Sequence, residues 1–365
     1  MSADRVVPDA AEGEAREETP PELAPWQKRL IEDRSAIIPL VPVAPGAKEA
    51  APKGLTDQPA KSGILVIDKP KGRTSHDVVQ AIRRASGERR VGHAGTLDPM
   101  ATGVLVLCIG SATRVVDEIQ ALPKVYGAEL RLGQETDTQD AEGRITAEQD
   151  WHHITAEAVE AALAAFRGDI LQVPPMHSAL HHEGKRLYQL AREGKEVERA
   201  PRALRVERLD LVAFEPPFLR LEMAVSKGFY VRSLAHDLGR ALGCGAHLSG
   251  LVRLAVGQFR LAEAEPLPRA VEAFVEGWWP TMMHPLDAAL ERLPALIVDA
   301  DGERELRFGR QVPAGEAGRG MQGMVRAYGP EGRFIGLVEW DAAHQAWQPA
   351  KIFPSAAAAP KVDGG

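Results

Sequence analysis

The sequence predicts an α+β protein with a mixed, mainly antiparallel sheet and flanking helices, followed by a small β-rich domain at the C-terminus. Three observations lead to this fold class. Apolar runs of strand length alternate with helices that carry start and stop signals, but without the regular rhythm of parallel βαβ units. After Pro294 the sequence changes to short strands and turns. The length of 365 residues favours two domains over one.

The elements of the first domain follow from apolar periodicity and turn-forming residues. Strands are expected at 63–70, 103–110, 125–133, 205–215, 218–226 and 251–261. Helices are expected at 74–87, 111–123, 155–168, 232–245 and 268–279. Residues 91–103 contain too many turn formers to be either element, and residues 174–197 are typical of a polar loop that leads into a basic helix.

Capping residues define where these helices begin and end. Thr74 or Ser75 can cap the first helix, and Gly87 ends it. Ser111 is the candidate cap of the second helix and Thr155 that of the third.

The whole chain divides into four parts. Residues 1–60 are rich in Pro, Ala and Glu and poor in aromatic residues, which is typical of a disordered tail, and within them only 26–40 could fold into a short helix. We expect the first domain over residues 61–292. The second domain, over 293–354, contains a short helix, ERELRFG, and two strands joined by a Gly-Pro-Glu-Gly turn. Residues 355–365 form a second tail.

The composition excludes several classes of protein. Hydrophobic residues make up 44% and charged residues 26%, as in soluble globular enzymes. No apolar run reaches the roughly 18 residues of a membrane-spanning helix, and the acidic N-terminus lacks the apolar core of a secretory signal. The two cysteines, Cys108 and Cys244, exclude a disulfide framework and indicate the cytoplasm. No metal site is expected, because neither cysteines nor histidines have partners at ligand spacing.

The charge is distributed unevenly along the chain. The net charge is −7, but residues 61–127 hold 10 basic and 6 acidic residues, and residues 182–208 hold 8 basic and 5 acidic ones. Residues 1–60 hold 7 basic and 11 acidic residues. An acidic tail therefore masks two basic segments, a pattern that permits phosphate binding but is also typical of an ordinary solvated face.

The segment RVGHAGTLDPMATGVLVL, residues 90–107, is the most informative part of the sequence. It places an acid, Asp98, in a glycine-rich loop directly before a strongly apolar strand, and Pro99 restricts the backbone after it. A carboxylate held on a rigid turn suits a nucleophile or a general base. The alternative is an Asx turn, in which Asp98 only caps its own loop.

Several ordered motifs carry a resemblance to a known family. The Asp98 segment contains G-H-A-G-T-L-D-P and A-T-G, and G-S-A-T-R follows. I-L-V-I-D-K-P-K-G-R-T-S precedes it. Further along come R-L-G-Q-E-T-D-T-Q-D-A-E-G, V-P-P-M-H-S-A-L, K-G-F-Y-V-R-S-L and G-C-G-A-H-L-S-G-L-V-R-L. In this order the motifs resemble the bacterial tRNA pseudouridine synthase B (TruB) family over about residues 61–350. The resemblance implies the pseudouridine synthase fold and a PUA-like RNA-binding domain at the C-terminus.

The resemblance also implies catalytic roles for three residues. Asp98 falls on the nucleophilic aspartate, Arg232 on the arginine that pairs with it, and Tyr126 on the tyrosine that stacks on the base. A paired arginine lowers the pKa of a buried carboxyl group, so this pairing agrees with a nucleophile that must be ionised. The carboxylate can attack C1′ or C6 or remove a sugar proton, and these alternatives stay open. A non-catalytic tRNA-binding or RNA-folding module on the same scaffold is the alternative function.

The implied substrate is uridine 55 in the T-loop of tRNA. An extruded uridine is held by stacking and apolar contacts, which the resemblance assigns to Tyr126, Tyr230 and Leu251. The family's loop histidine falls on His93, which is expected to bind the substrate by filling the gap that the extruded base leaves. The isomerisation involves no redox step or group transfer, so no cofactor is expected. The expected partner is tRNA, through its T-arm and acceptor stem, bound by a monomer.

Basic side chains are expected to contact the RNA backbone. The resemblance implies an RNA-clamping insertion at about 172–208, within the second basic segment. The candidates for phosphate contacts are Lys69, Arg90, Lys185 and Arg186.

Overall fold

The computed structural model describes residues 61–178, 181–182, 184–187, 190, 193–195, 197–315 and 320–353. Both predicted tails lie outside the described residues, and so does the short helix expected within the first of them. Most of the basic helix expected before residue 197 lies outside them as well. None of the helices in the described ranges is long and apolar enough to cross a membrane.

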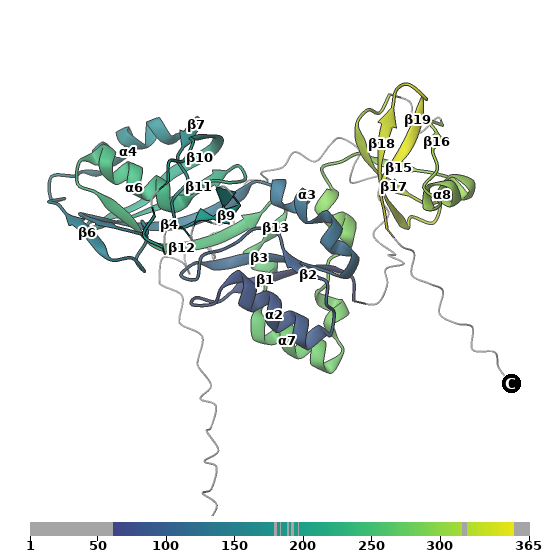
Figure 1. The fold of residues 1–365 in the computed structure, drawn as a ribbon, viewed down its shortest axis with the longest axis horizontal. Coiled ribbons are helices and arrows are strands. Elements are labelled where there is room, and N and C mark those ends of the chain that lie inside the picture. The colour runs from purple at the N-terminus through teal and green to yellow at the C-terminus, as the bar shows by residue number, and fades with distance from the viewer. Residues whose placement is uncertain are drawn as a thin grey trace, which may run out of the picture.

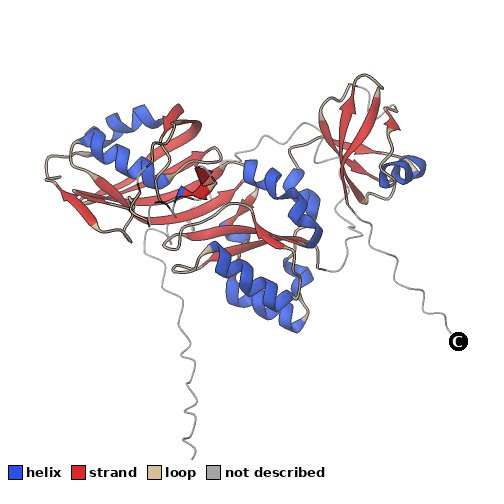
Figure 2. Ribbon diagram, viewed as in Figure 1, coloured by secondary structure: helices blue, strands red, loops and turns tan. Residues whose placement is uncertain are grey.

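One large mixed sheet forms the first domain (Figures 1 and 2). Its strand order is β14-β1-β3-β12-β4-β11-β10-β7, with β2 paired to β3 and β13 paired to β12. Only the β1–β14 and β3–β12 pairs are parallel, so the predicted mixed, mainly antiparallel sheet is confirmed. The strands are β1 (Gly63–Lys69), β2 (Val91–His93), β3 (Thr102–Ile109), β4 (Lys124–Leu132), β7 (Gly168–Gln172), β10 (Arg202–Glu215), β11 (Phe218–Val225), β12 (Ala246–Val256), β13 (Phe259–Arg260) and β14 (Glu265–Pro266).

Helices pack on both faces of this sheet. One face is covered by two pairs, α2 with α7 and α4 with α6, whose apolar residues share one core with alternate residues of the strands. The opposite face is covered by α3 and by the 3-10 turns at 110–115 and 286–290, and apolar residues of the C-terminal domain join the same core. The helices are α2 (Ser75–Ser86), α3 (Val116–Ala121), α4 (Ala156–Leu163), α6 (Val231–Leu242) and α7 (Leu267–Glu276).

The helix boundaries test the capping predictions. Thr74, not Ser75, caps α2, in a capping box with Asp77, and Gly87 ends the helix in the left-handed conformation. Thr155 caps α4. The prediction for Ser111 is wrong, because it lies inside a 3-10 turn that precedes α3 and caps nothing.

Three strand predictions also need correction. Residues 91–93, expected to be loop, form β2, because the edge of β3 offers them backbone partners. β12 begins at Ala246, five residues before the expected strand, since H-L-S-G pairs with β4 around a bulge. Residues 202–208 of the expected insertion belong to β10, so the part that connects β7 to β10 is 173–201. It contains a small hairpin of β8 (His181–His182) and β9 (Lys185–Arg186).

The C-terminal domain is a curled five-stranded sheet with one helix. Its strand order is β15-β17-β18-β19-β16, and the predicted turn at Gly-Pro-Glu-Gly joins β17 to β18. The sequence did not indicate β19. The domain docks on the first through a Lys351–Glu118 ion pair (Nζ to Oε1, 2.6 Å). Its elements are β15 (Ala295–Ile297), α8 (Ala300–Arg307), β16 (Val312–Pro313), β17 (Met324–Tyr328), β18 (Phe334–Asp341) and β19 (Ala346–Ile352).

Candidate active site

The loop between β2 and β3 carries Asp98 and is tied to the start of α2. The Ser75 hydroxyl accepts a hydrogen bond from the Leu97 amide at 2.9 Å and donates to the Leu97 carbonyl at 3.1 Å. The Gly72 amide donates to the Pro99 carbonyl at 2.8 Å. The residues on both sides of Asp98 are thereby fixed to the segment 72–75, which leads into α2, and the carboxylate has a defined position.

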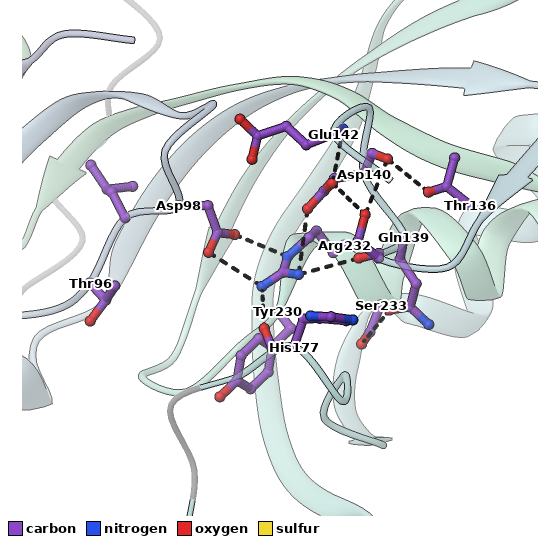
Figure 3. A network of polar contacts seen from close by, with 12 residues as sticks. Thr96, Asp98, Thr136, Gln139, Asp140, Glu142, His177, Tyr230, Arg232 and Ser233 are labelled. Atoms are coloured by element: carbon purple, nitrogen blue, oxygen red, sulfur yellow. Dashed lines mark hydrogen bonds and ion pairs between the residues drawn. The ribbon is translucent and has the colours of Figure 1, made fainter. Parts of the chain in front are cut away.

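The Asp98 carboxylate points away from its own loop and toward Arg232, in the first turn of α6 (Figure 3). Arg232 Nε lies 3.0 Å from Asp98 Oδ2, and Nη2 donates to Oδ1 at 3.3 Å. The two side chains therefore form a two-point ion pair. The Asx-turn alternative is wrong, because no backbone amide within the described loop donates to this carboxylate.

Arg232 is buried and serves several acceptors at once. Its side chain is 7% exposed. Nη1 lies 3.4 Å from Asp140 Oδ2 and donates to the Thr138 carbonyl at 3.2 Å, and Nη2 donates to the His177 carbonyl at 2.8 Å. With four groups around it, the guanidinium has one defined orientation toward Asp98.

Asp140 is a residue of this site that the sequence analysis did not single out. It is buried, and its Oδ1 accepts hydrogen bonds from the Thr138 hydroxyl at 2.6 Å and the Glu142 amide at 3.1 Å. These bonds hold the carboxylate that shares Arg232 with Asp98. The available signal was the acid-rich, glycine-ended motif T-D-T-Q-D-A-E-G, whose individual acids had no assigned role.

Burial and neighbouring charges compete to set the pKa of Asp98. Burial raises the pKa above its ordinary value, the Arg232 guanidinium opposes this, and Asp140 adds to it. The net shift is upward, so the expected lowering by Arg232 only partly offsets burial. The pKa of Glu142 is also raised, by burial and by the charges of Asp140 and Asp98. An ionised Asp98 is therefore held in surroundings that disfavour its charge.

Lys69 supports the loop from inside the protein. It is fully buried, and its Nζ donates to the carbonyl oxygens of Arg73 at 2.6 Å, Pro70 at 2.9 Å and Pro99 at 3.2 Å. Burial lowers the pKa of Lys69 to about 8. The prediction that Lys69 contacts the RNA backbone is wrong, because its ammonium group is enclosed by protein carbonyls.

The other candidates for phosphate contacts are placed differently. Arg90 is exposed on 62% of its side chain, with Nε 3.7 Å from Glu88 Oε1. Lys185 and Arg186 form β9, but their side chains lie outside what the structure describes.

Tyr126 and Leu251 lie on neighbouring strands and on the same face of the sheet. In the antiparallel pair of β4 and β12, Tyr126 is opposite Arg253, and Leu251 is opposite Ala128. Both Tyr126 and Leu251 are nearly buried and belong to the core that also includes Leu97 of the Asp98 loop. They therefore share an apolar environment with that loop.

Tyr230 and His93 come from two other elements of the fold. Tyr230 precedes α6, two residues before Arg232, and the Gln172 side-chain amide bonds its backbone N–H and C=O at 2.8 and 3.0 Å. Figure 3 shows its ring on the side of Arg232 where His177 lies. His93 is on β2 opposite Leu107, and burial lowers its pKa, so the neutral ring is favoured.

Within the described ranges, no group of three or more His, Cys, Asp or Glu side chains is placed to hold a metal ion.

Comparison with known proteins decides the family. Residues 83–231 match the profile of the TruB family pseudouridylate synthase N-terminal domain, and residues 232–291 that of the tRNA pseudouridylate synthase B C-terminal domain. The tRNA pseudouridine synthase B of Dehalococcoides mccartyi strain BAV1 is 40% identical over 291 residues, which cover 80% of this chain and 96% of the relative. The chain belongs to the TruB family. The tRNA pseudouridine synthase B of Syntrophotalea carbinolica is 47% identical over 248 residues, which cover 68% of this chain and 81% of the relative.

Solved structures show the same fold at lower sequence identity. A Cbf5-Nop10-Gar1 complex contains a chain with a TM-score of 0.64 and 24% identity, which covers 89% of this chain and 94% of the matched one. A chain in the structure of an H/ACA RNP bound to a substrate RNA containing 2'-deoxyuridine has a TM-score of 0.62 and 22% identity, and the match covers 80% of this chain and 86% of the other. These likenesses support the pseudouridine synthase fold with its C-terminal domain. As a TruB protein, this chain is a tRNA pseudouridine synthase, an intramolecular isomerase.

Proposed function

We propose that this TruB protein converts uridine 55 in the T-loop of tRNA to pseudouridine, with Asp98 as the nucleophile. The observation that carries the proposal is the two-point ion pair between Asp98 and Arg232 on a loop fixed at both flanks. In the isomerisation the bond from N1 to C1′ breaks, a bond from C5 to C1′ forms, C5 loses its proton and N1 gains one. The reaction is balanced within the nucleotide, so this proposal includes no cofactor.

Arg232 gives Asp98 the charge state that this chemistry needs. A buried carboxyl group alone stays protonated to higher pH, and a protonated acid is a poor nucleophile. The guanidinium favours the ionised form while surroundings that disfavour charge keep the carboxylate reactive. The same ionised group serves an attack at C1′, an attack at C6 or removal of a sugar proton.

The uridine must leave the folded T-loop before it can react. In our proposal the extruded base stacks on Tyr126 and contacts Leu251, and Tyr230 closes the other side. The positions of Tyr126 and Leu251 support these contacts, because the two residues lie on neighbouring strands and on one face of the sheet, in the same core as Leu97 of the Asp98 loop. His93, at the opposite end of that loop, fills the space that the extruded base leaves in the RNA.

Contacts far from the reacting base position the tRNA. Arg90 offers a charge to the phosphate backbone, and the segment 173–201 that joins β7 to β10 clamps the T-arm. The C-terminal domain contacts the acceptor stem. A monomer in the cytoplasm carries out the reaction. A non-catalytic tRNA-binding module would have no use for a half-buried carboxylate paired with a buried arginine.

A mapped product tests the proposal. The enzyme is incubated with an unmodified tRNA transcript and with the same transcript carrying cytidine at position 55, and pseudouridine is mapped at each uridine. We expect pseudouridine at position 55 of the first transcript and none in the second. Modification of another uridine in either transcript would contradict the proposed specificity.

A further inference from the structure

Arg253 on β12 is a buried arginine that bonds the backbone of the Asp98 loop. The residue is 1% exposed. Its guanidinium donates from Nη2 to the Gly95 carbonyl at 3.0 Å and from Nη1 to the Thr96 carbonyl at 3.3 Å. A third bond, from Nε to the Val104 carbonyl at 2.7 Å, reaches the strand that follows the loop. One side chain thus joins the segment before Asp98 to the segment after it.

The charge of Arg253 is balanced only by carbonyl groups. Among the residues that the structure describes, no carboxylate forms an ion pair with it. A buried charge without an acidic partner costs stability unless its donors are all bonded, and carbonyl oxygens compensate for it less than a carboxylate does. An apolar residue would fill the same space at lower cost, so the guanidinium's contribution is the position of the carbonyls that it bonds.

The backbone opposite Arg253 is built to let it approach. β12 runs parallel to β3 here, with Arg253 opposite Gly103. A Cβ atom at Gly103 would lie 2.3 Å from the Arg253 carbonyl oxygen, and the glycine has φ +96°, so no other residue fits without moving a strand. This close approach places the guanidinium beneath the loop.

The same strand also carries the predicted wall of the base pocket. Leu251 is two residues before Arg253 and on the same face, and Tyr126 is directly opposite Arg253. We propose that Arg253 is a positioning residue that fixes the distance between the Asp98 carboxylate and the uracil pocket formed by Leu251 and Tyr126. It acts through the loop backbone and does not touch the substrate.

The test compares two buried arginines. Arg326, in the C-terminal domain, is 2% exposed and bonds the Leu293 carbonyl and the Tyr328 hydroxyl. Arg253→Lys and Arg326→Lys are made in the full chain, and three quantities are measured: the single-turnover rate per folded molecule on unmodified tRNA, the Kd for tRNA, and amide hydrogen exchange of residues 94–98.

We expect Arg253→Lys to lower the rate about tenfold or more, since small misplacements of reacting groups are costly, while the Kd changes less than about threefold. The amides of residues 94–98 should exchange faster in Arg253→Lys only, and Arg326→Lys should keep the wild-type turnover rate whatever its loss of Tm. A wild-type rate in Arg253→Lys, or unchanged exchange of the loop, would overturn the proposal.

Arg253→Gln repeats the comparison if Arg253→Lys does not fold. If neither Arg253 variant folds while Arg326→Lys does, Arg253 is only a core residue and the proposal fails. The proposal rests on Asp98 being the reacting carboxylate. Turnover by Asp98→Asn would overturn that assignment, whereas the exchange of the loop would still report whether Arg253 holds it.

Discussion

Arg232 Nε lies 3.0 Å from Asp98 Oδ2, although 134 residues separate the two in the sequence. The pair joins the loop that precedes β3 to α6, the helix that packs on the neighbouring strand β12. Because Arg232 also contacts Asp140, one guanidinium stands between two carboxylates. The charge on Asp98 therefore depends on how Arg232 is shared.

The pH dependence of the reaction should report this sharing. Burial raises the pKa of Asp98 and the Arg232 guanidinium opposes this rise. A cation that contacts the carboxylate less closely therefore leaves that pKa higher. Arg232→Lys cannot keep the two-point contact, and we expect its rate to fall by about 10²-fold at neutral pH. The acidic limb of its single-turnover rate profile should move to higher pH. A limb at the wild-type position would show that Arg232 does not set the charge of Asp98.

Asp98→Asn should make the folded protein more stable at neutral pH. A folded-state pKa above the unfolded value means that ionising Asp98 costs folding free energy as the pH rises through that window. Asparagine removes the cost, and Arg232 keeps its bonds to Asp140, Thr138 and His177. We expect Tm to rise by about 2–4 °C per kcal/mol gained, and the difference from wild type to vanish below the ordinary aspartate pKa. Equal Tm values at neutral pH would contradict the upward shift.

Two variants separate the ring of Tyr126 from its hydroxyl. Tyr126→Phe keeps stacking, worth about 1–3 kcal/mol, and Tyr126→Leu loses it. If the hydroxyl also relays the proton from C5, Tyr126→Phe should slow turnover by about 10²–10⁴-fold. We expect both variants to be slow in single-turnover assays. Full activity of both would exclude Tyr126 from the active site, and a normal rate of Tyr126→Phe alone would leave only stacking.

The parts of the fold that depend on local signals could be predicted from the sequence. Gly87 ends α2 as its residue type indicates, and the apolar runs predicted most of the strands of the first domain. The short strand at 91–93 could not be foreseen, because it forms by pairing with residues 107–109 of β3, and nothing in its own residues indicates that pairing. Ser111 has the chemistry of a cap, but the chain turns too tightly around it to use it.

The candidate site divides in the same way. Asp98 was predicted because its loop precedes an apolar strand and matches the family's motif, while the residues alone left an Asx turn open. Asp140 and Arg253 were not predicted, since Asp140 contacts Arg232 and Arg253 contacts the Asp98 loop, and residues so distant in the sequence cannot be paired from their spacing. Lys69 looked like a surface cation among other basic residues, and only the fold shows that its ammonium group is enclosed.

Salt should weaken tRNA binding in proportion to the number of phosphate contacts. Arg90→Gln is expected to reduce the slope of log K against log salt by about 1. Arg269→Gln is the matched control, because Arg269 is equally exposed, at 62%, and paired with Glu265, but lies outside both basic segments. Removal of residues 1–60 should leave the affinity unchanged. Equal slopes for the two arginine variants, or a large loss on removing the tail, would contradict this distribution of contacts.

The most direct test of the account is the turnover of Asp98→Asn. Asparagine keeps the shape of the side chain and removes the charge that Arg232 stabilises. The variant is incubated in excess over an unmodified tRNA transcript, pseudouridine is mapped at position 55, and the Kd for the same tRNA is measured. We predict no detectable pseudouridine and a Kd close to that of the wild type, because affinity comes mainly from phosphate contacts. Pseudouridine at position 55 formed by Asp98→Asn would contradict the central claim.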